Sequence, residues 1–211
     1  MIVRVPVPFR CPPALRPHLE SIFSGSEYDV PLKRRAPPVI IDLGANCGAF
    51  SVWASYRWPG AEIHAYEPHP ESFKFLEENT TGIENVYLNQ WGIGKPGFRP
   101  LYDGRNNSGE ATLYPNACSS GIGQHVQILD PLTLPQADIL KIDIEGAELE
   151  VLEPLMKDGR TFTAVMIEYH HEFFRRRIDQ LLGEDYVLTG SRVSKWTHDI
   201  GVVRYVNKEY L

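Results

Sequence analysis

The chain has 211 residues, of which 43% are hydrophobic and 23% are charged, a composition that suits one soluble domain with a sizeable core, or such a domain with an added arm. Its net charge of −6 argues against a protein that mainly binds the nucleic-acid backbone. From this charge we expect no nucleic-acid partner. No run of about 18 apolar residues is present, so we expect neither a membrane span nor a membrane partner.

The cysteines and the first residues indicate a cytoplasmic location. Cys11, Cys47 and Cys118 are odd in number and widely spaced, which suits reduced thiols better than a disulfide framework or a zinc site. The first ten residues, MIVRVPVPFR, lack the continuous apolar core of a secretory signal.

Residues 1–38 are predicted to form a proline-rich arm before a domain that spans residues 39–211. The arm holds eight of the 17 prolines, so it cannot be one continuous helix. Ala14–Phe23 has the pattern of a short helix that Ser24-Gly25 would end. The arm could cover a ligand site as a lid, or it could pack across the edge of a sheet.

A β-α-β unit follows the arm. Val39–Ile41 is a short apolar run that predicts a buried strand, and a glycine-containing turn leads from it into a helix that ends near Pro59-Gly60. A second strand, Glu62–Tyr66, delivers the acidic residue Glu67. Such a unit places a ligand against the turn and a carboxylate where it can hold a ribose.

The rest of the chain continues the alternation of helices and strands. Further helices are predicted over Pro70–Asn79, Gly146–Met156 and Phe173–Leu182. Further strands are predicted over Asn85–Asn89, Phe98–Tyr102, Ala111–Leu113, Val126–Leu129 on an edge, Asp138–Asp143, Ala164–Ile167, Tyr186–Gly190 and Gly201–Val206. This order predicts an α/β sandwich whose sheet is mainly parallel with an antiparallel edge.

The first turn favours one class of nucleotide-like ligand. It offers only Gly44 and Gly48, with Asn46 where the dinucleotide fingerprint G-x-G-x-x-G needs its middle glycine, so NAD and FAD are disfavoured. Asp42 could help to fix an ammonium group, and Glu67 could accept hydrogen bonds from both ribose hydroxyls. S-adenosylmethionine has these groups. The alternative is that the glycines only allow close packing and that Asp42 is a cap.

Three blocks together resemble the FkbM-type S-adenosylmethionine-dependent methyltransferases: Asp42–Phe50 (DLGANCGAF), Tyr66–Pro70 (YEPHP) and Leu140–Leu152 (LKIDIEGAELEVL). The polar loop Arg105–Gly109 is similar to a loop of that family, though less closely. The resemblance implies a class I, Rossmann-like, seven-stranded sheet with helices on both faces and the cofactor at the carboxyl ends of the strands. It also implies methylation, typically of a hydroxyl group on a small molecule or sugar.

On this reading we expect the cofactor to contact residues from the first turn and from the ends of the second and third strands. These are Asp42, Gly44, Ala45, Asn46, Gly48, Glu67, Pro68, Trp91 and Gly92. Trp91 stands where the family usually has a small residue, and it is either a core residue or a wall that stacks on adenine.

The reaction itself is expected at the carboxyl ends of the later core strands, where Asp143, Glu145, Glu168 and His170 gather. A hydroxyl acceptor needs a base, and Asp143, Glu145 and His170 are the candidates. Asp143 could instead cap the turn at Gly146, and His170 could be satisfied by backbone hydrogen bonds. Lys141 and Glu148 are expected to be structural, for example as a salt bridge. The acidic residues and the histidine could also suit a hard cation, but nothing fixes their spacing, so no metal is assigned.

The preferred interpretation is a small-molecule O-methyltransferase. An N-methyltransferase that acts on an amine or peptide, and a module that binds S-adenosylmethionine without catalysis, stay as alternatives. Methylation of a nucleobase is disfavoured because KIDIEG stands where a [DN]-P-P-[YFW] block would be needed. The run Arg175–Arg177 could bind an acidic substrate group, although a charge run is usually a solvated helix face.

Overall fold

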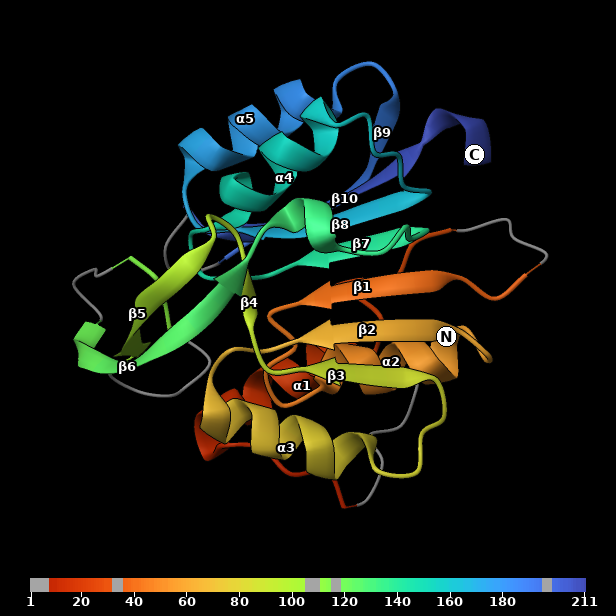
Figure 1. The fold of residues 1–211 in the computed structure, drawn as a ribbon. Coiled ribbons are helices and arrows are strands. Elements are labelled where there is room, and N and C mark those ends of the chain that lie inside the picture. The colour runs from red at the N-terminus through yellow and green to blue at the C-terminus, as the bar shows by residue number, and fades with distance from the viewer. Residues whose placement is uncertain (1–7, 32–35, 105–110, 115–118, 195–198) are drawn as a thin grey trace.

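The computed structural model describes residues 8–31, 36–104, 111–114, 119–194 and 199–211 (Figure 1). Its centre is a seven-stranded sheet in the order β3-β2-β1-β7-β8-β10-β9. In chain order these strands are β1 (Val39–Leu43), β2 (Glu62–Tyr66), β3 (Val86–Asn89), β7 (Ile139–Ile142), β8 (Ala164–Tyr169), β9 (Tyr186–Val193) and β10 (Gly201–Asn207). Neighbouring strands are parallel except that β10 runs antiparallel to both β8 and β9. The mainly parallel sheet with an antiparallel edge is therefore confirmed.

Helices cover both faces of this sheet, as the sequence predicted (Figure 1). The helices α1 (Arg16–Phe23), α2 (Ala49–Arg57) and α3 (Pro70–Thr80) lie on one side, and α4 (Glu148–Lys157) and α5 (Glu172–Leu182) lie on the other. Short 3₁₀ helices span Pro13–Leu15, Pro131–Thr133 and Lys208–Tyr210.

Alternation along the strands explains why both faces need a cover. Ile40 belongs to the core cluster under α2, whereas the next residue, Ile41, belongs to the cluster under α4 and α5. Val165 and Met166 divide in the same way along β8. Because successive side chains point to opposite faces, a strand that is apolar throughout must be buried on both sides.

A second, three-stranded sheet in the order β4-β6-β5 stands beside the main one. Its strands are β4 (Gly92–Ile93), β5 (Gly97–Gly104) and β6 (Ser119–Leu129). The strand predicted at Val126–Leu129 is confirmed as the end of β6, but its predicted position on an edge was wrong, because β4 and β5 flank β6 on its two sides. The strand predicted over Ala111–Leu113 was also wrong: this segment makes one isolated bridge, between Tyr102 and Thr112.

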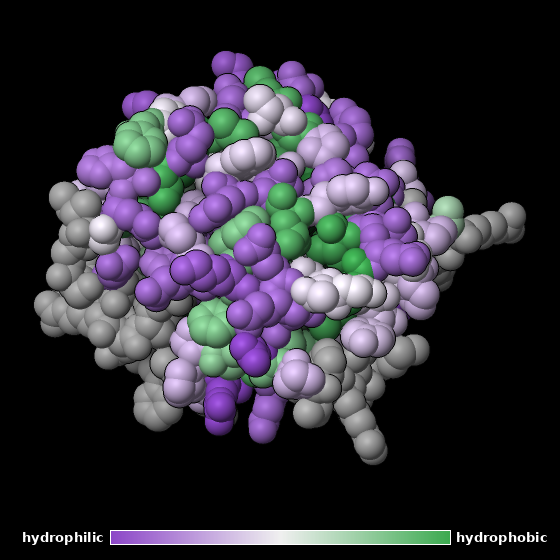
Figure 2. Space-filling view, turned by 60° about the horizontal axis from the view of Figure 1, so that its bottom comes forward, coloured by the Kyte–Doolittle hydropathy of each residue, from purple (hydrophilic) through white to green (hydrophobic). Residues whose placement is uncertain are grey.

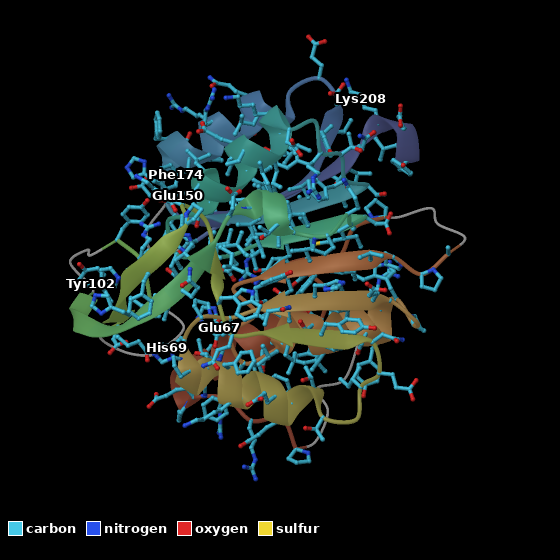
Figure 3. All side chains as sticks on the ribbon, viewed as in Figure 1. Glu67, His69, Tyr102, Glu150, Phe174 and Lys208 are labelled. Atoms are coloured by element: carbon cyan, nitrogen blue, oxygen red, sulfur yellow. The ribbon has the colours of Figure 1, made fainter. Side chains whose placement is uncertain are left out.

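The small sheet is tied to the start of α4 through Glu150, which is labelled in Figure 3. One carboxylate oxygen of Glu150 accepts hydrogen bonds from the backbone amide of Lys95 at 2.8 Å and from the Arg99 guanidinium at 2.7 Å. The other accepts one from the Tyr114 hydroxyl. The sheet is therefore held beside the loop that joins β7 to α4.

The arm packs over α2. A short helix was predicted there, and α1 confirms it with nearly the same bounds. Phe23, Tyr28 and Val30 are buried in one cluster with residues of α2. Arg57 of α2 pairs with Asp29 of the arm at 2.8 Å. The division of the chain at residue 38 and the role of the arm as a lid stay predictions.

Hydrophilic residues cover most of the face shown in Figure 2, with small apolar patches between them. Within the described part of the chain, no helix is both long and apolar enough to cross a membrane. Cys47 is buried, Cys11 is half-buried and both thiols are free. Cys118 and the loop Arg105–Gly109 lie outside the described residues.

Candidate active site

A cavity of about 230 Å³ opens at the carboxyl ends of the parallel strands. Its walls come from the turn after β1, the end of β2, the loop after β7, the arm and the small sheet. Most of the site residues expected from the sequence line it: Gly44, Ala45, Asn46, Glu67, Pro68, Gly92, Asp143, Glu145 and Glu168. Asp42, Gly48, Trp91 and His170 are not among the lining residues.

The first turn is shaped by close contact with the loop after β7. Gly44 has a φ of +73°, and a Cβ at this position would overlap the carbonyl oxygen of Asp143. The amides of Gly44 and Ala45 both donate to the carbonyl oxygen of Tyr66 at 3.0 Å. Asn46 has a φ of +50°, which is uncommon for a residue other than glycine. Its buried Oδ1 atom has no hydrogen-bond partner among the described residues.

Gly48 packs against helix α3 and does not line the cavity. It is the left-handed N-cap of α2, and a Cβ there would lie 2.8 Å from Leu76 Cδ1 of α3. The sequence assigned it to the cofactor site, and that contact stays a prediction.

Glu67 is the acid at the end of β2, where Figure 3 labels it beside His69. The side chain is fixed at both oxygens, because Oε2 accepts from the Asn46 amide and Oε1 from the His69 amide, each at 2.8 Å. Glu67 is 7% exposed. Burial raises its pKa to about 7, although the two backbone hydrogen bonds act in the opposite direction. The carboxyl group is thus held rigidly at the cavity wall.

Asp42 is fully buried and already has protein partners. Its Oδ2 accepts from the Ser51 hydroxyl at 2.7 Å, and its Oδ1 lies 3.1 Å from the Lys141 ammonium. Lys141 also donates to the carbonyl oxygen of Gly44 at 2.8 Å. Asp42 thus pairs with a lysine of the chain itself, and its expected contact with the ammonium group of the cofactor stays a prediction. The expected salt bridge between Lys141 and Glu148 is not formed, because Glu148 pairs with His170 at 2.7 Å.

Asp143 and Glu168 form a pair of carboxyl groups at the cavity. Although burial acts to raise it, the charge of Lys141, 3.5 Å from Asp143, holds the pKa of Asp143 below its usual range. Burial and the neighbouring Asp143 carboxylate raise the pKa of Glu168 well above its usual range. Two buried carboxyl groups in contact do not both ionise easily, so Asp143 carries the charge and Glu168 the proton.

His170 lies behind the cavity between two other carboxylates. Its Nδ1 is 2.7 Å from Glu148 and its Nε2 is 3.1 Å from Glu145. Burial acts to lower the pKa of His170, but these two partners raise it well above its usual range. The alternative of a histidine satisfied by the backbone is thus replaced by an imidazolium between side chains. The two contacts let His170 hold Glu145 and Glu148 in place, and its role as a base stays a prediction.

Glu145 is presented by an unusual backbone conformation, with a φ of +54°. Its carbonyl oxygen accepts a hydrogen bond from the Thr112 hydroxyl at 2.6 Å. Burial raises the pKa of Glu145, and the charge of His170 acts against that rise. The alternative role of Asp143 as a cap for Gly146 is taken by Glu148, whose Oε1 accepts from the Gly146 amide at 2.9 Å.

A metal ion fits this cluster poorly. Asp143, Glu168 and His170 each bring one atom of a ligand type to within 4.8 Å of the others. However, the Lys141 ammonium stands 3.5 Å from Asp143, and both nitrogens of His170 face carboxylates. These contacts favour a carboxyl pair that shares a proton over a set of metal ligands.

Trp91 is 38% exposed, and the neighbouring Gly92 and Ile93 line the cavity in its place. Its contact with adenine stays a prediction. Sequence reasoning missed other lining residues, Tyr28 of the arm and Lys141 among them. Lys141 stands in the KID block, so its position was visible; nothing in the sequence connected Tyr28 to a strand end 115 residues away.

The run Arg175–Arg177 does not reach the cavity lining. Arg175 pairs with Glu172 and Asp179, and Arg176 also pairs with Glu172. Arg177 pairs with Glu153 of α4 at 2.8 Å. These contacts are typical of a solvated helix face.

Comparison with known proteins places the chain among methyltransferases. Residues 42–188 match the family model described as the methyltransferase FkbM domain. The chain is similar to methyltransferase sdnD of Sordaria araneosa, with 29% identity over 64% of this chain and 66% of that protein. It is also similar to the hexuronic acid methyltransferase AglP of Haloferax volcanii, with 24% identity over 69% of this chain and 62% of that protein. The chain thus spans somewhat less than two thirds of the length of these relatives.

Among solved structures, the fold resembles fibrillarin of Aeropyrum pernix, described as a complex with natively bound S-adenosyl-L-methionine. The TM-score is 0.50 at 13% identity, over 85% of this chain and 70% of that one. At this identity the likeness shows a shared fold.

Proposed function

The chain belongs to the FkbM methyltransferase domain family, and from this premise we propose that it transfers the methyl group of S-adenosylmethionine to a hydroxyl group of a small molecule or sugar. The observation that carries the proposal is the division of the cavity. One side presents Glu67, fixed by two backbone amides, and the other presents Asp143, Glu145 and Glu168.

The first side fits the cofactor. Glu67 keeps lone pairs for ribose hydroxyls, and the turn from Gly44 to Asn46 brings backbone groups to the cavity wall. The buried Oδ1 of Asn46, which lacks a partner among the described residues, can accept a hydrogen bond from the ligand. When bound, S-adenosylmethionine supplies a methyl group on a sulfonium centre. The fold shared with a protein that binds this cofactor supports the assignment.

The second side fits a hydroxyl acceptor. Methyl transfer needs the acceptor oxygen held in line and relieved of its proton. Glu145 is the base in this proposal, because burial brings its pKa closer to neutral pH, where a general base works best. The imidazolium of His170, 3.1 Å away, holds Glu145 in place. Asp143, kept ionised beside Lys141, accepts a hydrogen bond that orients the acceptor.

A second candidate function, methylation of an amine, is favoured by the charge of the lining. Glu27 adds a further carboxyl group to Glu67, Asp143, Glu145 and Glu168, whereas Lys141 is the one lysine or arginine among the lining residues of the described chain. Lys141 is itself paired with Asp42. A neutral or cationic acceptor suits these walls better than one with a free carboxylate.

The test is transfer of an isotope-labelled methyl group from S-adenosylmethionine to pools of small molecules, read by mass spectrometry. The proposal expects a labelled product whose methyl group is on oxygen, and its loss in Glu145→Gln. A methyl group on nitrogen would support the second candidate. Cofactor binding without any labelled product would instead indicate a binding module and would refute both.

A further inference from the structure

Tyr28 lies in the arm, outside residues 42–188 that match the family, yet it lines the same cavity as the catalytic candidates. It is 1% exposed, and its hydroxyl donates a hydrogen bond to Asp143 Oδ2 at 3.3 Å. A buried phenol needs such a partner. The partner here is a side chain of the proposed active site, which links the arm to the chemistry.

The position of Tyr28 is held from several sides. Its ring meets the edge of Phe50 of α2, with centroids 5.2 Å apart at 75°, and the Lys141 ammonium lies 5.9 Å from the ring centroid. The residues on either side are also tied down. Glu27 lies 3.3 Å from Arg192 of β9, and Asp29 pairs with Arg57 of α2. The arm therefore cannot shift at this point without breaking contacts to two different elements.

Asp143 is faced by groups from four parts of the fold. Lys141 reaches it from β7 and Tyr28 from the arm, while Glu168 and His170 stand at the end of β8 and Glu145 follows in its own loop. Lys141 and His170 favour the ionised form of Asp143, and the two glutamates act against it when they are charged. The Tyr28 hydroxyl donates a hydrogen bond to the carboxylate, so it also favours the ionised form of Asp143.

Burial and the charge of Asp143 raise the pKa of Tyr28 well above its usual range. The phenol therefore keeps its proton at neutral pH and donates it in a hydrogen bond. Unlike Lys141, it adds no charge, so its main effect is to fix which way the Asp143 carboxylate points.

We propose that Tyr28 is a positioning residue of the active site, whose hydroxyl orients the Asp143 carboxylate and stabilises its ionised form, so that the arm is a working part of the methyltransferase. The hydrogen bond between Tyr28 and Asp143 is observed in the structure. Its consequence for turnover rests on the proposed function, in which Asp143 orients the acceptor.

The first experiment follows Asp143 without any acceptor. Protein labelled with ¹³C at the aspartate carboxyl carbons is titrated by NMR, and Asp143→Asn identifies the Asp143 signal. In Tyr28→Phe, which keeps the ring and removes only the hydroxyl, the pKa of Asp143 is expected to rise. Tyr56→Phe is the matched control, since Tyr56 lies on α2 and is 50% exposed; it should leave the signal unchanged. An unchanged Asp143 titration in a folded Tyr28→Phe protein would overturn the proposal.

The second experiment uses the acceptor found by labelled methyl transfer. Tyr28→Phe should raise KM for the acceptor about 3- to 10-fold, less than the full value of a hydrogen bond to a charged group, because the lost bond acts on the acceptor only through Asp143; the affinity for S-adenosylmethionine should change little. In the Asp143→Asn background the same change should have almost no further effect. If the NMR shift appears but acceptor kinetics do not change, Tyr28 still positions Asp143, and the role of Asp143 in the proposed function is what fails.

Discussion

Replacing Glu67 by glutamine should remove a loss of stability that the wild-type protein undergoes as the pH rises, while it weakens cofactor binding. Glu67 is 7% exposed, and burial raises its pKa from 4.5 to about 7. The folded protein therefore disfavours the ionised form relative to the unfolded chain. A rise of this size corresponds to roughly 3 kcal/mol against folding once the carboxyl group is ionised in both states.

The raised pKa of Glu67 decides how the free energy of unfolding changes with pH. Below about pH 4.5 the carboxyl group is protonated in both states and costs nothing, and the cost is complete above about pH 7. Glutamine cannot ionise. The free energy of unfolding of Glu67→Gln minus that of the wild type should therefore grow by about 2.5 kcal/mol between pH 5 and pH 8.

Urea unfolding of the protein without cofactor at these two pH values measures this difference. Because only its change with pH is compared, any constant cost of glutamine against the Asn46 and His69 amides cancels. Glu77→Gln, at an exposed carboxylate on α3, is the matched control. A difference that stays the same from pH 5 to pH 8 would refute the reasoning. The same variant should bind S-adenosylmethionine on the order of 10- to 100-fold more weakly, because a charged acceptor for the ribose is lost.

Two further substitutions test the framework of the site. Gly44→Ala places a Cβ on the carbonyl oxygen of Asp143. It should destabilise the protein by several kcal/mol more than the control Gly82→Ala, where φ is also positive (+81°) but nothing lies within 4 Å. Equal unfolding midpoints of the two variants would contradict the close contact. His170→Ala leaves Glu145 and a second buried carboxylate without their partner and should cost about 3 kcal/mol. Because the folded-state pKa of His170 is raised, this loss should be largest below about pH 6.5 and shrink as the pH rises through the folded-state value; a loss that grows with pH would show that His170 is neutral in the fold.

The strands and helices could be predicted because each carries its own periodicity. Val39–Ile41 and Ala164–Ile167 are apolar runs of strand length, and their burial under helices on both faces follows from that pattern. The short strand β4 could not be found, since Gly92–Ile93 is defined only by pairing with Ile128 and Leu129, far along the chain. Local sequence carries no signal for such a pair.

The site was predictable where backbone geometry demands particular residues, and less so where partners come from a distance. Gly44 must be a glycine because of the Asp143 carbonyl, and Glu67 follows directly from the end of β2. That Asp42 is paired with Lys141 could not be read from the sequence, because it depends on the register between β1 and β7. Tyr28 depends on how the whole arm docks.

Calorimetric titration with S-adenosylmethionine and with its demethylated product tests the central claim most directly. The claim is that the cavity between the Gly44 turn and Glu67 is a cofactor site. The account predicts that the wild-type protein binds both ligands with one site per chain, and that Glu67→Gln weakens both. Absence of binding to either ligand by the folded wild-type protein would contradict it.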